Sequence, residues 1–243
     1  FLTLGVTPYA GSGSANLVAT FPKANVGTWN NVDLGYERKD TGGYFEWQKN
    51  SPFYFRVDGN QVKTEGTKVG AWSNGTSPTQ GYVDTAIPVQ YETNNATFEA
   101  GYTTRTMTFT ASYLVSNFNN ASQTMTFTNP YFTNATDRAY LPPDNEYQRL
   151  ALNGVIRALP LNSTLALRYT WDKTESEFNV ASTVLGGTTT APAFINVAPS
   201  TNQFDGDETR QTFTLGWAAT PIANLDTKVY YNWLENLRDW CIS

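Results

Sequence analysis

The sequence has 243 residues, of which 40% are hydrophobic and only 15% are charged, as expected for one large β domain or part of a longer chain. The formal charge of -5 comes without a cluster of Lys and Arg, which argues against a nucleic-acid partner. No apolar run approaches the roughly 20 residues of a membrane helix, so this chain could cross a bilayer only as a closed β-barrel.

Apolar and polar residues alternate with a period of two along the chain, which predicts β-strands. A short strand is expected within residues 1–9 and a fuller one at residues 32–36. In "PFYFRVD", Phe53, Phe55 and Val57 alternate with polar neighbours. The same alternation recurs at residues 96–103, 106–115, 149–156, 164–172, 213–217 and 225–231. The prediction is a single barrel segment over residues 1–243 with about 8 to 9 strands, each near the length of a tilted membrane strand.

The predicted connections come in two lengths that take turns along the chain. Tight connections are expected near residues 40–42, 103–105, 159–163 and 221–224. Long, polar connections are expected at residues 59–93, 117–146 and 173–209. Outer-membrane barrels have short periplasmic turns at one end and long external loops at the other, whereas soluble sandwiches mostly use short connections throughout. The sequence therefore predicts an all-β, antiparallel transmembrane barrel.

Aromatic residues near the predicted strand ends favour the same fold. They include Trp47, Tyr113, Trp171 and Trp233, which fit the aromatic girdles of a membrane barrel. Two alternatives remain open at this point. One is a small self-contained barrel that serves as a passive pore or an adhesin, and the other is a soluble β-sandwich whose exposed aromatics bind carbohydrate.

The residue types exclude several kinds of chemistry. There is no histidine and Cys241 is the only cysteine, so an internal disulfide, a haem attachment motif and a histidine general base cannot be built from this chain. No glycine-rich phosphate loop follows a strand. We therefore expect neither catalysis nor a cofactor of this chain's own. Weak metal candidates are three carboxylates of "FDGDETR", which is expected to be an external loop: Asp205, Asp207 and Glu208.

Alternation also predicts which side chains face the barrel interior. An inward face should be polar, because an isolated Arg or Lys facing lipid costs about 2–4 kcal/mol at the midplane. The predicted inward residues are Asp33, Glu37, Arg56, Glu99, Arg149, Asn153, Arg168 and Asp172. Both signs of charge are present, so neighbouring strands could pair them.

Several stretches resemble one known family. "SPFYFRVDGNQVKTEGTKVG", "AIPVQYETNNATFEAGY", "TNPYF", "YLPPDNEYQRLALNG" and "LPLNSTLALRYTWDKTES" are similar to the MtrB/PioB family of decahaem-associated outer-membrane porins. The likeness runs from about residue 29 to residue 176 and more faintly to residue 231. Its most specific pieces are the Pro-Asp-Asn element and the Arg-Tyr-Thr-Trp-x-Lys-Thr stretch.

The resemblance implies a bacterial outer-membrane barrel that encloses a periplasmic multihaem c-type cytochrome and so forms an electron conduit for extracellular electron transfer. Haem c is then expected only in the partner, and an extracellular multihaem cytochrome is a second expected partner. The family's barrels are larger, and its N-terminal cysteine pair and its C-terminal half have no counterpart here. We therefore expect this chain to be a fragment of a longer barrel. An independent argument agrees, since a barrel of about 8 strands is filled by its own side chains or holds one small ligand.

Overall fold

The computed structural model describes residues 2–3, 6–8, 31–49, 51–73, 81–128, 136–179, 184–186 and 203–241, and all regular elements among them are β-strands. The described residues include no helix that is long and apolar enough to span a membrane. The long strands are β4 (Gly35–Trp47), β5 (Phe53–Ser73), β6 (Gly81–Thr103), β7 (Met107–Asn120), β10 (Asn145–Leu159), β11 (Ser163–Asn179), β13 (Gln203–Ile222) and β14 (Leu225–Cys241).

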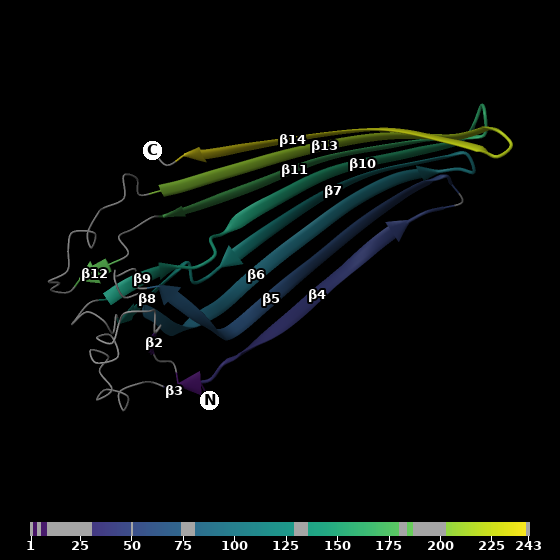
Figure 1. The fold of residues 1–243 in the computed structure, drawn as a ribbon. Helices are drawn as coiled ribbons and strands as arrows, with labels where there is room; N and C mark the ends of the chain where they lie inside the picture. The colour runs from purple at the N-terminus through teal and green to yellow at the C-terminus, as the bar shows by residue number, and fades with distance from the viewer. Residues whose placement is uncertain are drawn as a thin grey trace.

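These long strands form one antiparallel sheet in the order β14-β13-β11-β10-β7-β6-β5-β4. Each strand of this path pairs with the previous long strand of the chain, as in an up-and-down barrel. Figure 1 shows the strands running side by side as one curved wall. Within the described residues β4 and β14 do not pair with each other, so the sheet is not closed.

Short strands lie at the other end of the sheet from the tight turns (Figure 1). The strand expected within residues 1–9 is two pieces: β1 (Leu2–Thr3) pairs with β3 (Asn31–Val32), and β2 (Val6–Pro8) pairs with β6. A separate three-stranded sheet contains β8 (Thr124–Thr128), β9 (Thr136–Tyr140) and β12 (Val184–Gly186). We call this last unit the loop sheet, because the connections after β7 and β11 supply its strands.

Three of the four predicted tight turns are confirmed, at residues 104–106, 160–162 and 223–224. The turn predicted at residues 40–42 is wrong, because these residues lie within β4 and the real turn lies between Trp47 and Phe53. Gly42 lies within β4, where it allows close approach to β5. A Cβ on it would lie 2.7 Å from the Cβ of Asn60 on β5, so only glycine permits this approach of the strands.

The long connections are shorter than predicted, because the strands continue into polar sequence. Most of residues 59–93 belongs to β5 and β6, which pair without a register shift from Phe53↔Tyr102 to Ser73↔Tyr82. β11 extends to Asn179 and β13 begins at Gln203. These regions were predicted as loops because both faces are polar there. Polarity alone does not distinguish a solvated strand from a loop.

The described part of the molecule has little interior. No large side chain in it is fully buried, and its buried hydrophobic residues are Ile87, Val89, Ala139, Leu141, Ala151 and Ala219. A soluble sandwich would bury one face of each sheet against the other. The long strands instead form a single layer with two accessible faces, so the function must be sought on those faces.

Candidate functional site

The register divides the side chains of the long strands between two faces, because cross-strand partners lie on the same side of an antiparallel sheet. One set carries large hydrophobic residues, among them Phe55, Phe98, Leu152 and Leu167. We call this side the apolar face. Phe98 is 46% exposed and Leu167 is 39% exposed, and similar residues surround them. A soluble monomer rarely leaves so extended an apolar surface in water.

The hydrophobic residues of the apolar face form a band of limited height. On β7 the band runs from Met107 to Val115, and on β10 it runs from Leu150 to Ile156. At about 3.4 Å per residue these spans are about 27 and 20 Å, close to the roughly 25 Å of a membrane barrel's lipid-facing band. Trp171 lies within the band but is opposite Gln211 on β13, so the band shifts along successive strands. Tilted strands in a barrel show such a stagger.

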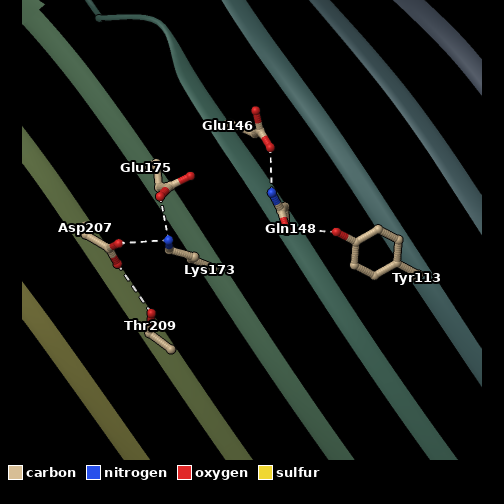
Figure 2. A network of polar contacts seen from close by, with 7 residues as sticks. All are labelled: Tyr113, Glu146, Gln148, Lys173, Glu175, Asp207 and Thr209. Carbon is tan, nitrogen blue, oxygen red and sulfur yellow. Dashed lines mark hydrogen bonds and ion pairs between the residues drawn. The ribbon is translucent and has the colours of Figure 1, made fainter.

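A polar belt borders the band on the same face, toward the loop end. Figure 2 shows contacts within this belt. The Tyr113 hydroxyl donates a 2.8 Å hydrogen bond to Oε1 of Gln148, whose Nε2 donates a 2.6 Å bond to Oε1 of Glu146. Nζ of Lys173 lies 3.1 Å from Oδ2 of Asp207. A tyrosine with its ring toward the band and its hydroxyl in this belt suits a membrane–water interface. The belt therefore indicates where the hydrocarbon contact ends.

Charged groups in the belt are held in their ionised forms. Hydrogen bonds from Asn94 and Lys63 hold the pKa of Glu92 below its usual value. Hydrogen bonds to Glu175 and Asp207 raise the pKa of Lys173. Ion pairs of this kind lie outside the apolar band, where water can solvate them.

The opposite side, which we call the polar face, carries charge where the apolar face carries hydrocarbon. In the register of β4, β5 and β6, Arg56 lies between Glu46 and Glu99. Its guanidinium binds Asp58 through two hydrogen bonds of 2.7 and 2.9 Å, and lies 3.9 Å from Oε2 of Glu46. The Tyr54 hydroxyl donates a 2.9 Å bond to Glu99. Three carboxylates thus surround one guanidinium; Glu46, Arg56, Asp58 and Glu99 form the negative patch.

The charge arrangement is reversed on β10, β11 and β13. Asp172 lies between Arg149 and Arg210 in the register. Nε of Arg149 is 3.4 Å from Oδ1 of Asp172, and the Tyr147 hydroxyl donates a 2.6 Å bond to the same oxygen. Arg168 lies four residues before Asp172 on the same face. Three guanidinium groups therefore accompany one carboxylate, and Arg149, Arg168, Asp172 and Arg210 form the positive patch.

Two guanidinium groups of the positive patch are available to another molecule. Arg168 and Arg210 are exposed, and neither makes an ion pair or hydrogen bond with any other described residue. The residues of β7 between the two patches, such as Thr110 and Ser112, are uncharged. The polar face therefore presents separated regions of opposite charge to whatever lies against it.

The sequence-predicted inward residues fall into three groups. Six lie on the polar face: Arg56, Glu99, Arg149, Asn153, Arg168 and Asp172. The prediction for Glu37 is wrong. Glu37 lies ten residues before Trp47 in the same strand, so both side chains lie on the apolar face. Glu37 is opposite Glu65 on β5, and its carboxylate is 3.4 Å from Nζ of Lys39. Asp33 precedes β4 and has no strand register.

Arg210 is a polar-face residue that sequence reasoning missed. It was assigned to a loop, although the alternation through Phe213 and Leu215 extends back to it and would have revealed its face. The three metal candidates were also assigned to this loop, and that assignment is wrong because they lie in β13. Asp207 is on the apolar face with Asp205, whereas Glu208 is on the polar face, 3.1 Å from Arg238. The structure does not bring the three together, and no cluster of metal-ligating residues occurs in the described part.

A comparison with protein-family models agrees with this geometry. Residues 3–185 match the model described as "Putative outer membrane beta-barrel porin, MtrB/PioB". The chain belongs to the MtrB/PioB family. A search of curated proteins found no match.

Membership of the MtrB/PioB family indicates what each face of the sheet contacts. An MtrB/PioB porin is a β-barrel of the bacterial outer membrane, which confirms the predicted fold class and localisation. In such a barrel the apolar side faces lipid and the polar side lines the lumen. The apolar face described above has the residues and band height for the first role, and the polar face with its two patches has the residues for the second.

Proposed function

We propose that this MtrB/PioB chain forms part of the wall of a porin that encloses a periplasmic multihaem c-type cytochrome, of the decahaem type, and so makes an electron conduit for extracellular electron transfer. The wall itself would carry no haem and catalyse nothing. Its task would be to hold the cytochrome in the lumen and keep lipid away from it. An extracellular multihaem cytochrome is a further proposed partner at the outer end.

The observation that carries this proposal is the separation of charge on the polar face. A lumen that only passes water and solutes needs polar residues, but it does not need Arg168 and Arg210, which have no ion pair with a described residue, beside a region of opposite charge. Complementary charge patches orient a protein partner and exclude wrong orientations. The absence of histidine from the sequence supports a separate haem carrier, because histidine is a common axial ligand of haem iron.

The alternatives account for fewer of the observations. A small self-contained barrel would need β4 to pair with β14, and within the described residues they do not pair. A soluble carbohydrate-binding sandwich would need a second layer against one face of the sheet, and among the described residues no such layer covers the long strands. A porin that admits only solutes is the second candidate, which the following experiment separates from the cytochrome sheath.

Reversing the charge of Arg168 and Arg210 should weaken recovery of the cytochrome. We expect Arg168→Glu/Arg210→Glu to reduce co-purification of haem protein with the tagged porin, while heat-modifiable gel mobility, which reports barrel folding, is unchanged. Each lost charged hydrogen bond would cost about 1.5–3 kcal/mol, and less where water reaches the pair. The loss should appear first at high salt, where weaker surface attractions are already screened.

The matched control is Lys49→Glu/Arg105→Glu, which makes the same change of charge at exposed residues near the tight turns. This control should recover the cytochrome as the parent does. If the Arg168→Glu/Arg210→Glu variant also recovers it normally at every salt concentration, the positive patch does not hold the partner.

A further inference from the structure

The apolar side chains that are buried at the loop end lie away from the lipid band. Ile87 and Val89 are 7% and 3% exposed, and Leu141 is 6% exposed. In the membrane band of the same sheet, hydrophobic residues such as Phe98 remain accessible. The loop end therefore contains a small core of its own.

The register places one half of this core on the polar face. Val89 is opposite Gly66 and Ile87 is opposite Lys68. Gly66 and Lys68 are an even number of residues from Arg56 along β5, so they lie on the same polar face as Arg56. Their neighbours on the other side, such as Pro88, are only partly buried. Something must therefore cover Ile87 and Val89 from the side of the lumen.

The loop sheet has an apolar surface suited to that cover. In the hairpin of β8 and β9, Met125 pairs with Ala139. Leu141 follows β9, and its backbone N–H donates a 2.9 Å hydrogen bond to the Gln123 carbonyl. Ala139 and Leu141 are buried, whereas Thr124 and Thr126 on the other side are exposed. The hairpin is therefore amphipathic, and Figure 1 shows it beside the end of the sheet where β6 begins.

Asn120 fastens this connection to the polar face. It is the last residue of β7, is 3% exposed and lies on the polar face opposite Tyr91. Its Nδ2 donates a 2.8 Å hydrogen bond to the Pro142 carbonyl, and its backbone N–H donates a 2.6 Å bond to Oδ1 of Asp144. Nε2 of Gln123 donates a 2.8 Å bond to Oδ2 of Asp144. Both ends of the connection are thus tied together on the lumen side.

We propose that the loop sheet folds inward over Ile87 and Val89, so that it constricts the loop-side mouth of the porin and limits the size of the solutes that enter. Ile87 and Val89 are buried on the polar face, and the Asn120 anchor ties the connection that carries the buried Ala139 and Leu141 to that face. An outward-folded loop would leave Ile87 and Val89 exposed to the water of the lumen. This inference depends on the porin fold and is independent of the cytochrome.

Labelling of a buried position tests the cover. In full-length protein carrying Cys241→Ser, we expect Val89→Cys to react with a water-soluble maleimide at least about tenfold more slowly than Thr126→Cys, because local structure protects it. Adding Leu141→Asp, which places a carboxylate in the small core, should bring the Val89→Cys rate close to that of Thr126→Cys. Thr124→Asp, on the exposed side of the same hairpin, should leave the slow rate unchanged.

Liposome swelling with sugars of increasing size tests the constriction. The Leu141→Asp variant should admit larger sugars than the parent, while Thr124→Asp should not. If Leu141→Asp fails to show heat-modifiable folding, Asn120→Ala replaces it in both assays with the same expected results. Fast labelling of Val89→Cys in the parent, or an unchanged rate in the loosened variant, would overturn the cover. Faster labelling with an unchanged sugar limit would overturn the constriction.

Discussion

Replacing Leu167 by arginine is expected to prevent most of the protein from assembling into the outer membrane. Leu167 lies within the apolar band, opposite Leu215 on β13 and Gly154 on β10. An arginine facing lipid near the midplane costs about 2–4 kcal/mol, a large part of the roughly 5–15 kcal/mol that stabilises a typical domain. Heat-modifiable gel mobility of outer-membrane fractions would measure the folded share.

The neighbouring residue provides the control for this substitution. Arg168 is on the polar face, so Arg168→Leu changes no residue that contacts lipid and should assemble nearly as the parent does. The pair of variants exchanges the same two residue types at adjacent positions and differs chiefly in the face affected. Equal assembly of Leu167→Arg and Arg168→Leu would mean that neither face meets hydrocarbon.

Removing the carboxylate of the positive patch is expected to weaken the barrel. In Asp172→Ala, Arg149 loses its ion pair, Arg210 loses the compensating charge opposite it, and the Tyr147 hydroxyl loses its acceptor. Loss of a charged hydrogen-bond partner costs about 1–3 kcal/mol when the site is buried. Since the side chains of Arg149 and Asp172 are 39% and 21% exposed, solvent screening should leave the lower part of that range.

The temperature at which heat-modifiable mobility is lost would report this change. Asp172→Ala should lower that temperature, and adding Arg149→Leu should restore part of it by removing the uncompensated cation. Asp172→Asn should lie between the parent and Asp172→Ala, because it keeps an acceptor for Tyr147. A temperature unchanged in Asp172→Ala would contradict a structural role for the positive patch.

Local alternation was enough to predict the membrane-spanning parts of the wall. In residues 164–172 one face is wholly apolar, so the strand and its orientation follow from the sequence alone. Next to the tight turn at residues 160–162 Leu159 pairs with Ser163, and a register shift between Ile156 and Leu159 then places Arg149 opposite Asp172. Leu161 and Asn162 have positive φ in this turn, a conformation that favours asparagine.

Features that depend on distant pairing could not be predicted in this way. Arg210 lies opposite Asp172 through the register of β11 with β13, and no short turn sets that register. The polar half of β5 was predicted as a loop because its stabilising partners lie on β6, as when Gln61 bonds Glu92 and Asn94. Glu37 was assigned to the wrong face because a turn was predicted within β4. The polar half of β5 lacks a hydrophobic face, which is the signal that specifies register most strongly.

We propose that this chain is a haem-free wall around a haem-carrying partner. The most direct measurement is the absorption spectrum of the tagged protein purified from native outer membranes without denaturation, followed by haem staining after denaturing separation. We predict c-type haem absorption in the native complex, and a haem stain on a different polypeptide after separation. A native complex without haem, or haem that remains with this polypeptide after denaturation, would contradict the claim.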